Sequence, residues 1–373
     1  MIQNKKKPCE QLFYFGYFLF AAYSYLVHID IFSLLMKIGL AVAALLLVFC
    51  FIISQPFTIK EIVSLIIFAS LVAVITATSK DFGFFKLLIL MIGMKHVNFK
   101  KLVVFDYKIR IFFIIWVFFL CLIGVAPDQI VLRDNMERHS LGFTNPNVLG
   151  ITVSVYVFEY LYLHKLKLTI WRVFWIFTVV GFISYITDSR SAVFINLVLI
   201  LLAWIYSSSS WLLKKGIIKK IFIYSFLLFA GVTLLSYDLY KLGGDFAITL
   251  NKLLSNRLER IYIFAQEFDF SWFGQNISLL DMSLDNMYAY IFFGFGFIAF
   301  LICLILSILL IKKLYFLNDI PLVIIWVCFF AYGLSERIFI LAEYNVFMLA
   351  FSYLLYSNKE ENVVEEKYIG ARL

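Results

Sequence analysis

Five polar segments hold the side chains that could do chemistry, in a sequence that is 63% hydrophobic. Three of these segments supply arginines: 133–147 (RDNMERHSLGFTNPN), 188–191 (DSRS) and the long loop 236–285, which contains NRLER. The other two, 284–286 (LDN) and 335–345 (SERIFILAEYN), supply the carboxylates Asp285 and Glu336. Guanidinium groups match the oxygen atoms of a phosphate or a carboxylate. The five segments therefore predict a polar site that could bind an anionic group.

Arg257 and Arg260 are three residues apart, so on a helix they share one face. The apolar residues around them keep helical spacing, which predicts an amphipathic helix on the membrane or over a cavity. Two guanidinium groups on one face could grip a diphosphate. Alternatively, these arginines pair with Glu259, with Glu267 or with lipid headgroups.

The segment RHSLGFTNPN places Arg138, His139, Asn145 and Asn147 around Gly142, a glycine that permits a close turn. This grouping predicts one wall of a polar site. The alternative is structural. Asn145 could simply cap a helix that begins at Pro146, and His139 could be an ordinary loop histidine.

The remaining polar residues have structural alternatives as well. Arg190 could form a local ion pair with Asp188. Glu336 and Arg337 could pair with each other at the surface, where such a pair adds little stability. Asp285 could cap the helix that follows it.

The cysteines predict neither a disulfide nor a zinc site. They lie in apolar runs or in the N-terminal segment, and no CxxC or Cys/His cluster occurs: Cys9, Cys50, Cys121, Cys303 and Cys328. We also expect no cofactor.

Membrane-spanning helices are the elements that must position these residues. Only 15% of the residues are charged, the mean hydropathy is +0.94, and apolar runs of about 17 to 25 residues recur from end to end. We predict an all-α polytopic membrane protein, with residues 1–373 as one integral membrane domain, a large external loop over 236–285 between spans nine and ten, and a charged tail at 358–373. About twelve spans are expected, at 11–28, 31–53, 61–78, 83–94, 108–126, 147–163, 171–187, 191–206, 217–235, 286–311, 321–335 and 338–357.

The positive charges predict the orientation of these spans. Lys5, Lys6 and Lys7 favour a cytoplasmic N-terminus, and twelve spans then bring the C-terminus to the cytoplasm as well. The N-terminal segment resembles a signal, but no cleavage site follows, so we expect a retained first span. The predicted cytoplasmic cations, among them Lys312, Lys313, Lys108 and Arg110, are mostly lysines. All five polar segments fall on the external side. Six arginines fall there as well: Arg133, Arg138, Arg190, Arg257, Arg260 and Arg337. The net charge of +8 reflects this arrangement and does not suggest nucleic acid.

Four motifs between about 138 and 300 resemble the O-antigen polymerase and ligase superfamily of envelope polysaccharide synthesis. They occur in that family's order: GFTNPNVLG after the fifth span, SRSA at 189–192, NRLERIYIF in the large external loop, and SLDNMYAYIFFGFGFIAF at the start of the next span. The last motif is similar to the family's element in which His or Asp precedes Asn.

The resemblance implies an enzyme, a glycosyltransferase whose donor is a sugar on undecaprenyl diphosphate. It implies no metal and no nucleotide sugar. Arg190 and Arg260 match the family's diphosphate-binding arginines, and Arg257 is a second candidate. Asp285 occupies the position where the ligases have histidine, and it would be the general base for the acceptor hydroxyl. The other residues implied to bind substrate are Arg138, His139, Asn145, Asn147, Asn286, Glu336 and Arg337.

The predicted function is therefore polymerisation of lipid-linked oligosaccharide repeat units, for a capsule, O-antigen or exopolysaccharide, on the extracytoplasmic face of the cell membrane. The partners expected are the lipid-linked oligosaccharide, membrane lipid, a flippase and a chain-length regulator. A ligase that moves finished glycan to another acceptor is the alternative within the family. Outside it, a flippase would need charges along a through-path and two similar halves. A scaffold would not need arginine in place of lysine on the outside.

Overall fold

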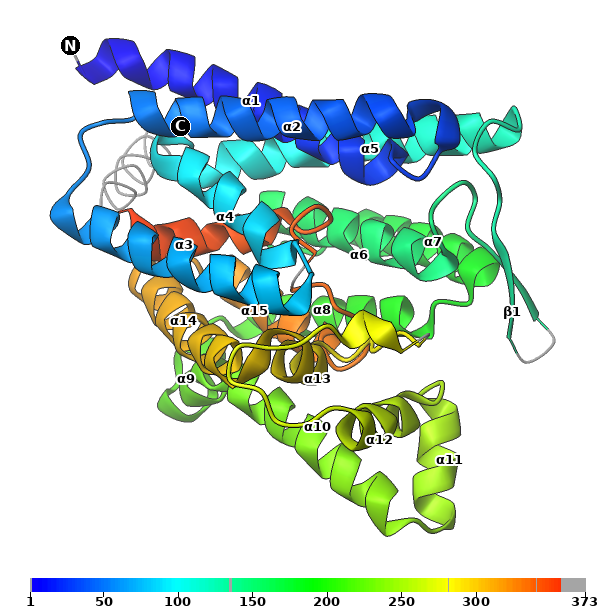
Figure 1. Ribbon diagram of the computed structural model, residues 1–373. Coiled ribbons are helices and arrows are strands. Elements are labelled where there is room, and N and C mark those ends of the chain that lie inside the picture. The colour runs from blue at the N-terminus through cyan, green and yellow to red at the C-terminus, as the bar shows by residue number, and fades with distance from the viewer. Residues whose placement is uncertain (1, 134–135, 281, 340, 357–373) are drawn as a thin grey trace. The chain divides into compact units, whose positions relative to one another are not determined.

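The computed structural model describes residues 2–133, 136–280, 282–339 and 341–356 (Figure 1). The predicted tail at 358–373 lies outside the described residues. Helices make up most of the described chain, which confirms the prediction of a helical protein. The chain divides into two compact units: unit 1 comprises residues 1–62, 89–211 and 343–373, and unit 2 comprises residues 63–88 and 212–342.

Unit 1 is built around long helices that pack in sequence order. α1 packs along α2, and α6 contacts α5, α7 and α8. The elements are α1 (Ile2–Leu26), α2 (Asp30–Ile53), η1 (Met94–His96), α5 (Phe99–Leu122), β1 (Ile130–Arg133), β2 (Met136–His139), α6 (Pro146–Leu163), α7 (Ile170–Thr187), α8 (Arg190–Ser209), η5 (Val346–Phe351) and α16 (Ser352–Leu355). Helices α3 (Ile59–Ser79) and α4 (Gly83–Gly93) continue from one unit into the other.

Unit 2 combines apolar helices with shorter amphipathic ones. Its elements are η2 (Leu212–Lys214), α9 (Gly216–Ile223), α10 (Ser225–Leu242), α11 (Asp245–Leu253), α12 (Arg257–Glu267), η3 (Ile277–Leu279), α13 (Met287–Tyr290), the π-helix η4 (Ile291–Phe295), α14 (Gly296–Phe316) and α15 (Ile320–Tyr332). α12 packs against α10 and α11. The segment predicted as a large loop thus contains two helices, and the amphipathic helix expected around Arg257 is α12.

Six helical segments of the described chain are long and apolar enough to cross a membrane: Asp30–Ile53, Ile59–Ser79, Ile170–Thr187, Arg190–Ser209, Ser225–Leu242 and Met287–Phe316. Their outward side chains are also apolar. On α7, for example, Trp171 and Phe174 are 77% and 65% exposed. Apolar surfaces of this extent need a lipid environment, so the chain is a membrane-embedded helical protein.

Three predicted elements differ from the structure. The apolar run 217–235 is two helices, α9 and α10, which meet at Tyr224, and α10 continues to Leu242. The run 338–357 is helical only from Val346, in η5 and α16. Part of the polar segment before α6 forms an antiparallel hairpin in which Ile130 pairs with His139. The hairpin escaped prediction because its strands have four residues each.

Two cations that the orientation argument placed in hydrated cytoplasmic positions are buried in unit 1. Lys95 is 3% exposed and pairs with Glu61 at 2.9 Å. Arg110 is 1% exposed and pairs with two acids. Buried and paired, neither side chain can act as a solvated anchor at the membrane edge. The predicted orientation, which counted both residues as cytoplasmic, stays a prediction.

Glycines hold the segment before η3 against the start of α14. Gly274 and Gly296 both have positive φ, 86° and 88°. A Cβ on Gly296 would lie 2.3 Å from the Gly274 nitrogen, so no larger residue fits there. The Phe297 N–H donates to the Ser271 carbonyl at 3.0 Å, which closes the contact. The glycines of this motif therefore fix a loop against a helix end.

Candidate functional site

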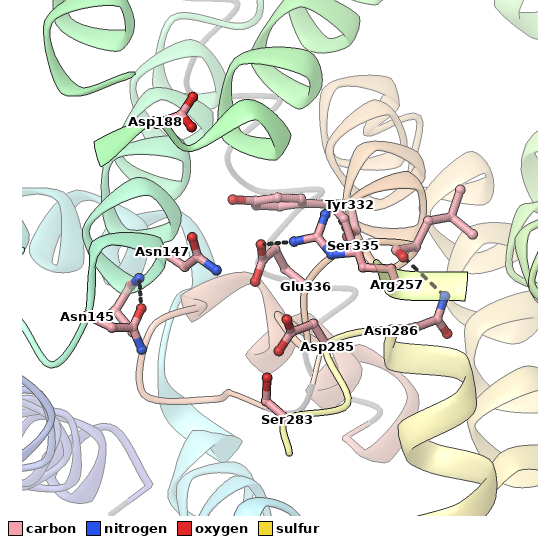
Figure 2. A network of polar contacts seen from close by, with 12 residues as sticks. Asn145, Asn147, Asp188, Arg257, Ser283, Asp285, Asn286, Tyr332, Ser335 and Glu336 are labelled. Atoms are coloured by element: carbon pink, nitrogen blue, oxygen red, sulfur yellow. Dashed lines mark hydrogen bonds and ion pairs between the residues drawn. The ribbon is translucent and has the colours of Figure 1, made fainter. Parts of the chain in front are cut away.

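The polar residues of unit 2 that the sequence singled out form a group that we term the α12 cluster: Arg257, Arg260, Asp285, Glu336 and Arg337. In Figure 2 the dashed contact between Arg257 and Glu336 joins α12 to the segment that follows α15. Arg257 Nη2 lies 2.8 Å from Glu336 Oε1, and Glu336 is 4% exposed. The alternative of a surface Glu336–Arg337 pair therefore does not describe Glu336.

Arg260 is the more accessible arginine of the two on α12. Its Nη1 lies 3.2 Å from Asp285 Oδ2 and also donates to Ser283 Oγ at 2.9 Å. The Arg260 side chain is 33% exposed and that of Asp285 is 18% exposed. The two arginines of α12 thus hold carboxylates from other segments. Glu259, the alternative partner expected from the sequence, accepts instead from the Asn251 amide at 3.3 Å.

Arg337 lies over an aromatic ring. Its guanidinium carbon is 4.6 Å from the centroid of Tyr290, a cation–π geometry. The Tyr290 hydroxyl donates to Asp81 Oδ2 at 2.5 Å, which ties the start of α4 to α13. Asp81 and Tyr290 could not be singled out from the sequence, because their relation to Arg337 depends on segments far apart in the chain.

Asn286, and not Asp285, caps α13. Asn286 Oδ1 accepts from the Ala289 N–H at 2.9 Å, and Nδ2 donates to the Leu334 carbonyl and to Thr233 Oγ1, both at 3.1 Å. The capping role suggested for Asp285 is therefore wrong. Asn286 is 3% exposed and its amide is engaged in holding three segments together. Its predicted role in binding substrate stays a prediction.

In unit 1 two arginines, Arg133 and Arg190, contact the same carboxylate, that of Asp188. We term these three residues the Asp188 triad. Arg133 at the end of β1 donates from Nε to Asp188 Oδ2 at 3.0 Å. Arg190 Nε lies 3.5 Å from Asp188 Oδ1, which confirms the local ion pair considered from the sequence. Asp188 ends α7 in the left-handed conformation, with φ of 43°. The Arg190 side chain is 49% exposed and can be reached from outside the protein.

Arg138 has a structural position beside this triad. It is 7% exposed, its Nε donates to the Thr187 carbonyl at 2.7 Å, and its Nη2 donates to Asn147 Oδ1 at 2.6 Å. Asn145 caps α6 by accepting from the Val148 N–H at 3.0 Å, with Pro146 in the first turn. The turn-and-cap interpretation of Asn-Pro-Asn is therefore confirmed. The substrate-binding roles of these residues stay predictions.

His139 contacts a carboxylate that the sequence did not single out. Its Nδ1 lies 2.6 Å from Asp128 Oδ2, and the backbone N–H groups of Ser140 and Leu141 donate to Asp128 Oδ1, both at 2.9 Å. Burial disfavours the charged form of Asp128. The hydrogen bonds from His139 and the two backbone groups outweigh burial and lower the pKa of Asp128 below its ordinary value. Asp128 therefore fastens the base of the hairpin.

Two of the sequence motifs meet inside unit 1. A Cβ on Gly150 would lie 2.5 Å from Ser189 Oγ, so the glycine of GFTNPNVLG lets SRSA pack closely on α6. α7 and α8 also border a mainly apolar pocket of about 430 Å³ that reaches Asp188. Its polar lining comes from Ser184, Asp188 and Asn196. The Asp188 triad thus lies next to an apolar pocket.

Neither cluster has the composition of a metal site. Within the described ranges, no group of three or more His, Cys, Asp or Glu side chains is placed to hold a metal ion. The chemistry available is ionic: guanidinium groups that can exchange carboxylates for phosphate, and carboxylates that can accept protons.

Comparison with known proteins adds no family to these observations: no protein-family model, no curated protein and no solved structure matches the chain.

Proposed function

We propose that the chain polymerises lipid-linked oligosaccharide repeat units, as the motif resemblance implies. It would transfer the growing glycan from undecaprenyl diphosphate to a hydroxyl of the next lipid-linked unit. The observation that carries this proposal is the Arg260–Asp285 pair, at 3.2 Å and partly exposed. In this pair, a guanidinium that can bind phosphate lies next to a carboxylate that can accept a proton.

The pair supports a simple exchange mechanism. When a diphosphate binds, the Arg260 guanidinium pairs with it instead of with Asp285. The Asp285 carboxylate can then accept the proton of the acceptor hydroxyl. The acceptor oxygen forms a bond to the anomeric carbon, and the bond from that carbon to the diphosphate breaks. The diphosphate leaves with the electron pair, and the guanidinium groups of Arg260 and Arg257 stabilise its charge. In unit 1, Arg190 is proposed to bind phosphate in the same manner.

The proposal includes the orientation and the location. We place twelve spans in the cell membrane, with both termini in the cytoplasm and residues 236–285 outside. The six apolar helices support a membrane location. Labelling of Asp245→Cys in intact cells is expected with an impermeant reagent. Labelling only after permeabilisation would contradict the orientation.

The function is tested with purified full-length protein in lipid nanodiscs and lipid-linked repeat units as substrate. Arg260→Lys keeps the charge but loses the fork, and Asp285→Asn keeps the shape but cannot act as a base. We expect normal folding with at least a hundredfold slower elongation in each case, about the range that one such group supplies. Arg172→Lys is the matched control, because the hydrogen bond of that guanidinium goes to the Lys167 carbonyl at 2.7 Å, outside the α12 cluster and the Asp188 triad.

Elongation at the wild-type rate in both variants would reject the proposed roles of Arg260 and Asp285. The products separate the alternatives for the whole protein. A ligase would move finished glycan to a new acceptor without lengthening lipid-linked units. A flippase would move labelled lipid-linked units across a bilayer without forming a glycosidic bond.

A further inference from the structure

Three ionisable side chains of unit 1 meet deep inside the protein, and we term them the buried triad: Asp106, Arg110 and Glu159. Their residues are 3%, 1% and 0% exposed. Arg110 Nη2 contacts Asp106 Oδ2, one helical turn away on α5. Arg110 Nε donates to Glu159 Oε1 of α6 at 3.1 Å. Arg110 was predicted only as a cytoplasmic cation near the start of the span 108–126.

Tyrosines complete the shell of this triad. The Tyr17 hydroxyl donates to Asp106 Oδ1 at 3.0 Å, and Arg110 Nη1 donates to the Tyr25 hydroxyl at 2.9 Å. Among the described residues, Tyr107 and Tyr344 also interact electrostatically with the charges of the triad. The hydroxyls are neutral at ordinary pH. The groups known to face the triad thus supply one cation for two acids.

This imbalance matters because the site is shut off from water. With both acids ionised, the triad would carry a buried net charge of −1. A buried charge without a partner is strongly unfavourable, and a protein avoids it by changing the protonation state. A proton on one of the two acids restores neutrality.

The geometry indicates where that proton resides. Among the described residues, Glu159 Oε2 is buried without a hydrogen-bond partner. Asp106 on α5 and Glu159 on α6 both contact the guanidinium of Arg110, so two carboxylates share one cation. A carboxylate oxygen can only accept a hydrogen bond, whereas a carboxylic acid can also donate one. A proton on Glu159 Oε2 therefore removes a buried charge that no donor satisfies and balances the triad.

We infer that Asp106 and Glu159 form a proton-binding site that holds one proton in the folded protein at neutral pH. The proton ties α5 to α6, and through Tyr17 and Tyr25 it supports the packing of α1. The unfolded chain, whose acids are in water, does not keep this proton at neutral pH. Unfolding therefore releases a proton, and stability falls as the pH rises through the titration of the site. The inference is independent of the proposed transfer reaction.

Infrared spectroscopy of the full-length protein in nanodiscs tests the site directly, because a protonated carboxyl group has its own carbonyl band. Wild-type protein at neutral pH is expected to show such a band, and Glu159→Gln should lose it. Asp106→Asn should lose or shift it. Glu61→Gln is the matched control. Glu61 is also buried, but Lys95 pairs with it at 2.9 Å and it does not belong to the buried triad, so its removal should leave the band unchanged.

A second readout separates a bound proton from a merely structural role. Glutamine imitates the protonated acid, so Glu159→Gln should keep the neutral-pH Tm and abolish the decline in Tm toward alkaline pH. A Tm that is lower at every pH with the wild-type slope would overturn the inference. So would the absence of a protonated-acid band in the wild type, a measurement that does not depend on any variant folding.

Discussion

Unit 1 contains two ionic triads of opposite composition. The buried triad has two acids for one guanidinium, and none of its residues is more than 3% exposed. The Asp188 triad has two guanidinium groups for one carboxylate, and its Arg190 side chain is 49% exposed. With every side chain ionised, each triad would have a surplus charge, but only the buried triad is sealed from solvent.

The difference shows how accessibility decides what balances a surplus charge. A sealed negative surplus can be neutralised only by something that remains inside the fold, and a proton is small enough. An open positive surplus is screened by water and salt, so it can persist until an anion arrives. The first triad therefore suits stability, and the second suits recognition of an anion.

The largest expected effect comes from removing the one cation of the buried triad. Arg110→Met leaves two buried acids without a positive partner, which should destabilise the protein by about 3 to 5 kcal/mol. Such a loss approaches the total stability of many domains. We expect little folded protein in size-exclusion chromatography, whereas Arg110→Lys should recover part of it. A Tm within a few degrees of wild type for Arg110→Met would mean that the triad contributes no stability.

The Asp188 triad should respond at the level of binding. Under the proposed function, Arg190→Lys should weaken binding of inorganic pyrophosphate about tenfold, because lysine cannot form the bidentate contact. Asp188→Asn should tighten it, since the competing carboxylate is gone. Titration calorimetry on the protein in nanodiscs measures both. Changes of the same sign in the two variants would show that Asp188 supports the anion site and does not compete with the anion.

The smallest expected effect concerns Asp128, a paired carboxylate outside the spans. Its pKa is lowered in the folded protein, so its contribution to stability is present above the unfolded value of about 4 and is lost as the pH falls through the lower folded value. Asp128→Asn imitates the acidic state at neutral pH. We expect faster hydrogen exchange, corrected for intrinsic rate, at the Ser140 and Leu141 amides in this variant and in acidified wild type. Unchanged exchange in both would contradict the role of Asp128 at the hairpin base.

Local features of the site could be predicted because they depend on neighbours in the chain. The cap at Asn145, the ion pair of Arg190 with Asp188 and the helix around Arg257 each involve residues within a few positions of one another. The partners of Arg257 and Arg260 could not be predicted, because Glu336 and Asp285 are 79 and 25 residues away. Charge alone made nearer acids, such as Glu259, equally plausible.

The sequence by itself determined that this is a helical membrane protein, since apolar runs of that length can satisfy their backbone groups in lipid only as helices. It also determined which segments are polar, because charges there interrupt the apolar runs. Only the tertiary structure decided which charges are solvated and which are enclosed. Arg110 and Arg190 are the same residue type, but the packing of α1, α5 and α6 seals Arg110 with two acids, while Arg190 stays open at the start of α8. The reason is physical: burial depends on which helices pack against a side chain, and helices far apart in the chain supply those contacts.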